Sequence, residues 1–539
     1  MATYPGHAGA HSRTPRSHNG PPSPAQFDPA AAAPAFDREI VLLAVTVILG
    51  TAMTVLDLTI VNVAIPTLGR ELGTSIATIQ WVLTGYMLAF ASVIPLSGWA
   101  TARFGARQVW VASLATFMLG SVLAGLAWSA SALVVFRVIQ GLGAGMLMPV
   151  GQAALAQAAG PARMGRVMSL FGLPMLLIPT LGPVLGGAIV EHASWRWIFF
   201  INVPVSLAAV LAAVRFLPAA RRSVAPRLDL RGLVLLSPGI AAFLFGVSEL
   251  GNRGTADSPP GISAVAAGAA LVAAFIWHAS RRGSAALVDV SLFRRRGFAT
   301  ASVTTFMLGV ALFGSLILLP LYYQVVRGQS PLQVALLLVP QGVGAALAMP
   351  LAGWLTDKRG ARVVVPAGGI VGALGTLAYT QVGAHTPYWL LAAALLVIGL
   401  GIGSTIMPCM AAAFQGLSRE QTPAATSALN VIQRVSGAVG TALLAVFLQR
   451  AIAAQVPRLH GDLQQMATLP QAQHLHLAPA LAHAFGATFW IAAALIAAAL
   501  IPALLLPSRP PAPAAAPHQH ADTRRTAQRE RVTTTVERS

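Results

Sequence analysis

Long apolar stretches separated by short polar turns run through most of this 539-residue chain. A helix rises 1.5 Å per residue, so about 20 apolar residues cross the roughly 30 Å hydrocarbon core of a bilayer. Fourteen stretches have the length and apolar character of such helices, near residues 39–66, 77–98, 108–127, 131–154, 166–190, 197–217, 230–249, 261–279, 298–325, 332–355, 363–382, 387–411, 424–449 and 483–506. The pattern predicts an all-α polytopic membrane protein with fourteen transmembrane helices.

The two ends of the chain do not follow this pattern. Residues 1–37 and 507–539 are rich in Pro, Ala and polar residues without an apolar core, which is typical of disordered tails and not of a cleaved signal peptide. Composition agrees with a membrane interior, because only 9% of the residues are charged, against roughly a quarter in soluble domains.

The net charge of +19 indicates topology and not nucleic-acid binding. With the N-terminus in the cytoplasm, eighteen Arg and Lys residues fall in inner loops and six in outer loops, before the tails are counted. Basic residues accumulate in cytoplasmic loops. We therefore expect both termini to be cytoplasmic. The compact loops favour the inner membrane of a bacterium.

Two short sequence motifs each occur in two similar copies along the chain. "GWATARFGAR" (98–107) returns as "GWLTDKRGAR" (353–362), and "GLGAGMLMP" (141–149) returns as "GLGIGSTIMP" (399–408), at nearly the same offset. A repeated offset indicates an internal repeat. It predicts two six-helix halves (38–229 and 298–506), two inserted transmembrane helices (230–280) and a cytoplasmic linker (281–297). Parallel halves around a central pathway are the architecture of alternating-access transporters.

Several motifs resemble those of the major facilitator superfamily, and in particular its fourteen-helix drug:proton antiporters. Beside the repeated loop motif, these are "LDLTIVNVAIP" in helix 1, "FRVIQGLGAG" in helix 4, "LGPVLGG" in helix 5 and "WRWIFFINVP" before helix 6. The resemblance covers nearly all of the chain except its tails. It implies the major facilitator fold with two added helices, no cofactor or bound metal, and export of hydrophobic drugs in exchange for protons.

The same resemblance assigns two groups of residues. In the family pattern the loop aspartate binds an arginine or a helix N-terminus across the cytoplasmic gate, a place taken here by Asp357 but not by Ala102, so we expect a looser or differently latched first-half gate. The alternative is that the basic gate residues only follow the positive-inside rule. The fifth-helix motif is associated with antiport, although Ile178 stands where the family often has its first glycine. The gate motifs comprise Gly98, Arg103, Gly105, Arg107, Gly353, Asp357, Gly360 and Arg362, and the antiporter helix motif comprises Gly182, Pro183, Gly186 and Gly187.

Three ionisable residues lie well inside the predicted spans: Asp57, Arg137 and Arg434. A charge at the centre of a membrane helix costs roughly 2.5–3.5 kcal/mol, so such residues are functional candidates. Helical rise places Asp57 and Arg137 at similar depth in the outer half. We expect Asp57 to carry the coupling proton and Arg137 to set how readily Asp57 takes it up. The alternative is a structural clamp that never titrates. Arg434 has no buried acid opposite it, and either a substrate or a structural role stays open.

Other classes of function find little support. The chain has one lysine, Lys358, without the glycine spacing of a phosphate-binding loop, and it has no HExxH motif and no paired intramembrane carboxylates. We therefore expect a transporter and not an enzyme, with a small-molecule substrate, protons and membrane lipid as partners and no nucleic acid. A dedicated exporter of one metabolite, a proton-coupled importer, and a periplasmic adaptor as used by some relatives stay open.

Overall fold

The computed structural model describes residues 38–160, 163–218, 227–253, 258–418, 420–456 and 471–508. Residues 1–37 lie outside the described residues, as do most of the predicted C-terminal tail and most of the segment between the last two helices. The described part consists of helices joined by turns, without a strand. This confirms the predicted all-α class.

The N-terminal group of helices begins at Arg38. Its helices are α1 (Arg38–Glu71), α2 (Ile76–Val93), α3 (Leu96–Phe104), α4 (Ala106–Gly125), α5 (Ala130–Ala159), α6 (Met164–His192), α7 (Trp197–Phe200) and α8 (Asn202–Phe216). The axis bends by 54° between α2 and α3. Pro95 lies in this break, where its missing N–H and its ring interrupt a continuous helix.

Two long helices follow as a hairpin, and the C-terminal group comes after them. The hairpin consists of α9 (Leu230–Arg253) and α10 (Pro259–Arg282), and short turns η2 (Gly283–Ala285) and η3 (Val290–Arg294) lead onward. The C-terminal group comprises α11 (Arg296–Leu321), η4 (Tyr322–Val326), α12 (Pro331–Leu337), α13 (Val339–Arg359), α14 (Ala361–Thr380), α15 (Tyr388–Gly403), α16 (Ile406–Ala413), α17 (Thr422–Gln455) and α19 (Gln471–Ala503).

Twelve helical segments of the described residues are long and apolar enough to cross a membrane, and the bent α2–α3 pair makes thirteen. The remaining predicted span, 166–190, falls within the 29-residue helix α6. The predicted linker 281–297 is shorter in the structure, because α10 continues to Arg282 and α11 already begins at Arg296.

The two groups repeat the same local geometry. Gly105 between α3 and α4 has φ 85° and ψ 153°, and Gly360 between α13 and α14 has φ 83° and ψ 159°. Each glycine donates its N–H to a threonine carbonyl four residues earlier, Thr101 at 2.8 Å and Thr356 at 2.9 Å. This left-handed region favours glycine, which explains why both copies of the motif keep it. We call the end of the bundle with these two turns the motif end.

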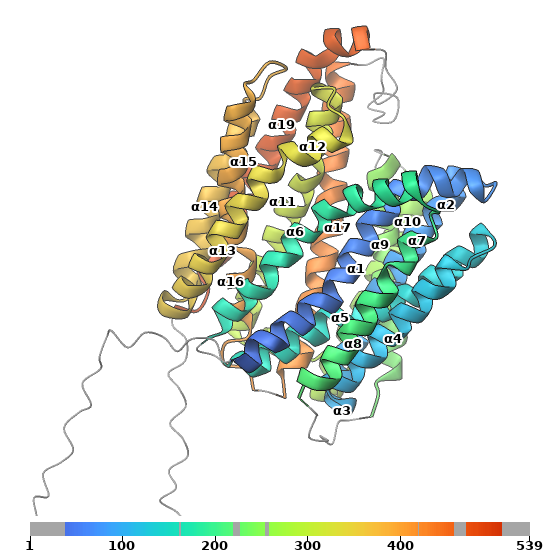
Figure 1. Ribbon diagram of the computed structural model, residues 1–539. Coiled ribbons are helices and arrows are strands. Elements are labelled where there is room, and N and C mark those ends of the chain that lie inside the picture. Colours follow the sequence, from blue (N-terminus) through green and yellow to red (C-terminus); the bar gives the residue numbers. More distant parts are fainter. Residues whose placement is uncertain are drawn as a thin grey trace, which may run out of the picture. The chain divides into compact units, whose positions relative to one another are not determined.

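The two groups contact each other near the motif end. There α6 packs against α13, and α17 packs against α3 and α5. In Figure 1 the α1–α8 helices, blue to green, meet the α11–α19 helices, yellow-green to red, near this end and lie further apart at the other. The α9–α10 hairpin packs against α2 and α17 through α9.

Asp229 fastens the turns after α10 onto the hairpin. Its buried carboxylate accepts hydrogen bonds from the backbone N–H of Gly232 at 3.1 Å and of Leu287 at 3.2 Å. His278 Nε2 lies 2.9 Å away and Arg282 Nη1 lies 3.3 Å away. Burial alone would raise the pKa of Asp229. The hydrogen bonds from His278, Gly232 and Leu287 outweigh burial and hold this pKa below its ordinary value.

We expect Asp229→Asn to lower stability by roughly 1–3 kcal/mol, because a charge-assisted acceptor is lost in a buried place. A lowered pKa stabilises the fold above the ordinary carboxyl value of about 4, and this contribution disappears as the pH falls below it. The thermal unfolding midpoint of Asp229→Asn should therefore lie below wild type at pH 7, and the difference should shrink below about pH 4. Asp289→Asn in the turns after α10, where the carboxylate only caps Ser291 N–H, is the matched control. An equal loss in both variants would contradict this role of Asp229.

Candidate functional site

A buried ion pair links α1 to α5. Arg137 Nη1 lies 2.5 Å from Asp57 Oδ2, and both side chains are fully shielded from solvent. Arg137 also donates through Nη1 to Gln140 Oε1 at 2.7 Å and through Nε to the Val82 carbonyl of α2 at 3.3 Å. The sequence predicted Asp57 and Arg137 at similar depth, and in the structure their side chains are in direct contact.

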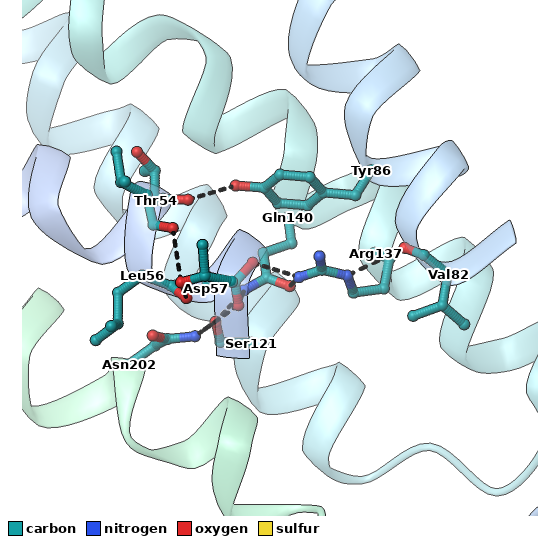
Figure 2. Close-up of polar contacts among 11 residues, drawn as sticks. Thr54, Leu56, Asp57, Val82, Tyr86, Ser121, Arg137, Gln140 and Asn202 are labelled. Carbon is teal, nitrogen blue, oxygen red and sulfur yellow. Dashed lines mark hydrogen bonds and ion pairs between the residues drawn. The ribbon is translucent and has the colours of Figure 1, made fainter. Parts of the chain in front are cut away.

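Neutral polar groups surround the other carboxylate oxygen. Asp57 Oδ1 accepts hydrogen bonds from Gln140 Nε2 and from Asn202 Nδ2, both at 3.0 Å. Both amide nitrogens also donate to Ser121 Oγ of α4, at 2.6 and 3.2 Å. Figure 2 shows Asp57 between Arg137, Gln140 and Asn202. Four helices, α1, α4, α5 and α8, therefore converge on one carboxylate.

Aromatic rings close the site on the side of Arg137. The guanidinium carbon lies 4.0 Å from the ring centroid of Tyr86 and 5.7 Å from that of Phe199. The Tyr86 hydroxyl points to the Thr54 carbonyl of α1 at 3.5 Å, and an apolar cluster from α1, α2, α4 and α5 packs around the group. In such apolar surroundings the two charges stabilise each other only while they stay in direct contact. Removal of one partner leaves an unpaired buried charge, which costs much free energy.

Two buried polar atoms of the site have no hydrogen-bond partner within the described residues. They are Arg137 Nη2 and Asn202 Oδ1. The carboxylate is fully satisfied as an acceptor in its ionised form. If it takes up a proton, its hydroxyl becomes a donor, and Asn202 can offer Oδ1 after rotation of its amide. The arrangement thus has polar partners for both protonation states.

The glycine motif of α6 packs directly onto α1 beside Asp57. A Cβ on Gly182 would overlap the side chain of Thr59, and a Cβ on Gly186 would lie 3.0 Å from the Ile60 carbonyl oxygen. A Cβ on Gly187 would meet nothing within 4 Å. Pro183 lies within α6, and Ile178 packs against the apolar cluster. Close approach of α6 to the Asp57 helix therefore depends on two glycines of the motif, Gly182 and Gly186.

We expect Gly182→Ala to lower the thermal stability of the purified protein, because the overlap with Thr59 must push α6 away from α1, at roughly 1–3 kcal/mol. Gly187→Ala is the matched control in the same motif. It should leave the unfolding midpoint unchanged or slightly raised, since alanine favours helix over glycine. Equal midpoints for the two variants would show that the α1–α6 contact does not need Gly182.

The second-half gate motif makes a latch between the two groups of helices. Asp357 accepts hydrogen bonds from the backbone N–H of Gly165 at 2.7 Å and of Arg166 at 3.3 Å, and from Arg166 Nε at 3.1 Å. These N–H groups open helix α6, where a negative charge is favourable. Gly353 packs closely against Gly165 and Ser169, which brings the Asp357 carboxylate of α13 within hydrogen-bonding distance of the start of α6.

The first-half gate motif makes its contact without a carboxylate. A Cβ on Gly98 would lie 3.1 Å from Ala424 Cα, so α3 passes very close to the start of α17. Ala102 supplies no acceptor, and Ser418 caps this start locally by accepting the Gln421 N–H at 3.3 Å. The first copy of the motif, which has Ala102 in place of the aspartate, thus joins the two groups by the close contact of Gly98 with Ala424 and not by a carboxylate latch.

The basic gate residues lie at the surface of the motif end. Arg103 and Arg362 are exposed and Arg107 is half-buried. Within the described ranges, none of the three makes an ion pair. These three arginines therefore make no ion pair across the gate, whereas Asp357 bridges the two groups.

Arg434 lies on the face of α17 that meets the N-terminal group. Nearer the motif end, the same face carries Ser427, which donates to the Ile94 carbonyl at 2.9 Å, and Asn430, which donates to Gln152 Oε1 at 2.8 Å. The Arg434 guanidinium carbon lies 4.2 Å from the ring centroid of Phe90 in α2. No acid and no hydrogen-bond acceptor for Arg434 is found within the described part of the chain.

Sequence reasoning missed Gln140, Asn202, Ser121 and Tyr86 as partners of the ion pair. A signal was available for the two amides, because Gln140 lies in "FRVIQGLGAG" and Asn202 in "WRWIFFINVP". An amide inside an apolar helix needs a hydrogen-bond partner, although this is a weaker signal than a charge.

A polytopic helical bundle with two repeated groups and a buried ion pair defines the class of secondary transporters. The profile described as Major Facilitator Superfamily matches residues 47–441. The chain belongs to this superfamily, whose members are transporters and not enzymes.

The curated relatives are bacterial. The chain is 41% identical over 471 residues to "Multidrug resistance protein B homolog" of Mycobacterium tuberculosis, covering 83% of this chain and 86% of the relative. It is 33% identical over 408 residues to "Multidrug export protein EmrB" of Haemophilus influenzae, covering 75% and 79%. These relatives match the predicted family of drug exporters.

Solved structures agree with the fold. The human organic anion transporter MFSD10 superposes with a TM-score of 0.57 at 15% identity, covering 86% of this chain and 100% of that structure. A double Trp mutant of XylE gives a TM-score of 0.58 at 13% identity, covering 88% and 97%. At this identity the likeness concerns the fold alone.

Proposed function

We propose that this protein exports hydrophobic drugs or related small molecules across the bacterial inner membrane in exchange for protons, by alternating access. The observation that carries the proposal is the fully buried Asp57–Arg137 pair within a four-helix polar cluster. Its relatives are named as multidrug resistance and export proteins. Both termini lie in the cytoplasm, and the motif end is the cytoplasmic side.

Asp57 is the proton carrier in this proposal, and Arg137 sets how readily Asp57 takes up a proton. Uptake of a proton removes the charge that Arg137 neutralises, so the attraction between α1 and α5 weakens. Asn202 Oδ1 then accepts a hydrogen bond from the new hydroxyl of Asp57. Because α6 packs on α1 through Gly182 and Gly186, a shift of α1 reaches the latch at the start of α6. Each proton that crosses contributes about 2.3 kcal/mol per 100 mV.

The gate follows from the same geometry. Contacts of α6 with α13 and of α17 with α3 hold the motif end closed, which corresponds to an outward-facing state. Residues 38–229 and 298–506 act as the two moving halves, and residues 230–280 travel as an inserted hairpin. A periplasmic adaptor is a further partner to test, since it would carry the substrate beyond the periplasm.

The coupling role predicts proton release from acidified inside-out vesicles when substrate is added. Vesicles with wild type should respond to at least one of ethidium, 2-naphthamide and 2-naphthoate, measured by an acridine dye that reports the pH gradient. Asp57→Asn should reduce this response at least about tenfold, because its amide cannot exchange a proton at neutral pH. Glu39→Gln, an exposed acid on the same helix, should respond like wild type.

Vesicles without the protein correct for passive entry of the probes. Full proton release by a folded Asp57→Asn variant would reject Asp57 as the carrier. No release with any of the three probes by wild type would reject drug:proton antiport.

The latch role predicts faster hydrogen exchange at the start of α6 in Asp357→Ala. Loss of charge-assisted hydrogen bonds should speed exchange of the Gly165 and Arg166 amides by about tenfold or more. Mass spectrometry of the corresponding peptide measures this rate. Asp289→Ala, which loses a carboxylate outside the gate, should exchange there like wild type. Unchanged protection in Asp357→Ala would mean that packing alone closes the gate.

A further inference from the structure

Arg434 is a cation inside the membrane part of the bundle for which the described residues offer no counter-charge. The helix starts at Thr422, so Arg434 lies about 18 Å along α17, near the middle of a bilayer. An unpaired guanidinium at this depth is costly unless water or an anion meets it. Asp57 is already satisfied by Arg137, Gln140 and Asn202. The partner of Arg434 therefore has to come from elsewhere.

The surroundings leave the hydrogen-bonding edge of Arg434 available. Its guanidinium stacks against Phe90 at 4.2 Å, and stacking uses the flat face while the in-plane N–H donors stay free. Those donors match the two oxygens of a carboxylate. The side chain is only half-buried, so a ligand can approach it.

Position along α17 places Arg434 beyond the contacts that close the motif end. Asn430 and Ser427 bond the N-terminal group one and two turns nearer that end, and Val431 packs against its apolar cluster. Gln433, on the same turn as Arg434, lines a hollow together with residues of α11 and α16. The hollow is lined by Thr305, Leu308, Gly309, Phe313, Ile406, Cys409 and Gln433. The hollow therefore borders the turn of α17 that carries Arg434.

Two neighbouring aromatic rings connect Arg434 to the Asp57–Arg137 pair. Phe90 lies 6.1 Å from Tyr86 between ring centroids, and Tyr86 lies 4.0 Å from the Arg137 guanidinium carbon. Only two aromatic rings, those of Phe90 and Tyr86, therefore separate a ligand on Arg434 from the Asp57–Arg137 pair. Phe90 and Tyr86 both belong to α2, so the ligand and the proton act on the same helix.

We propose that Arg434 is the anion-binding residue of the substrate site, and that this transporter prefers amphipathic aromatic compounds carrying one carboxylate or similar negative charge. The aromatic part of the substrate packs on the Phe313 side of α17, and the anionic group binds the free edge of Arg434. The inference rests on the proposed export function and adds the chemical class of the substrate.

The test uses the purified full-length protein and three probes of one shape: 2-naphthoate, 2-naphthamide and the cation 2-naphthylmethylammonium. Ligands that bind the folded state raise the unfolding midpoint, and at one ligand concentration the rise grows with the logarithm of the affinity. Wild type should bind naphthoate at least about tenfold more tightly than the other two probes, as expected for a charge-assisted pair. Arg434→Gln should lose this preference.

Two further variants separate charge from folding. Arg434→Lys keeps the charge and should keep most of the preference. Arg450→Gln, an exposed cation on the same helix, should bind all three probes like wild type. Equal affinity of wild type for naphthoate and naphthamide overturns the inference without any variant, as does undiminished naphthoate preference in Arg434→Gln.

Failure of the two proposals can be told apart. Proton release by ethidium or naphthamide without naphthoate preference leaves antiport standing and rejects the anion site. An Arg434-dependent naphthoate preference without proton release by any probe supports the anion site and rejects drug:proton antiport.

Discussion

A carboxylate placed among apolar helices can be kept only if both of its oxygens find donors, and this requirement organises the N-terminal half of the protein. Asp57 draws Arg137, Gln140 and Asn202 from two other helices toward α1. Because burial without such partners would cost far more than a helix gains by packing, the four helices have little freedom to rearrange while the acid is ionised.

The motif end shows how one loop sequence serves two different contacts. On one side Asp357 binds the first N–H groups of α6 and Arg166. On the other side Gly98 allows backbone contact with Ala424. The left-handed glycine turns are alike on both sides, since they depend only on local geometry. The latch depends on a partner from the other half, and it is present on one side only.

Much of the fold followed from the sequence because membrane spans are governed by length and apolarity, which are local properties. The ion pair was also predictable, since Asp57 and Arg137 are opposite charges at similar depth among very few charges in the spans. Asn202 was not found, because a neutral amide is inconspicuous among apolar residues and its partner lies 145 positions away. The stacking of Arg434 on Phe90 could not be predicted either, because it depends on how the two halves are placed.

The symmetry of the backbone is not shared by the charges. Glycines of α5 pack against α2 as those of α15 pack against α13, which is the expected trace of gene duplication. Yet the place of Arg137 in the second half is held by Leu395, and Asp357 stands where the first half has Ala102. The buried ion pair thus belongs to the first copy and the carboxylate of the latch to the second. Neither half carries both features, so a symmetric dimer of either half alone would lack one of them.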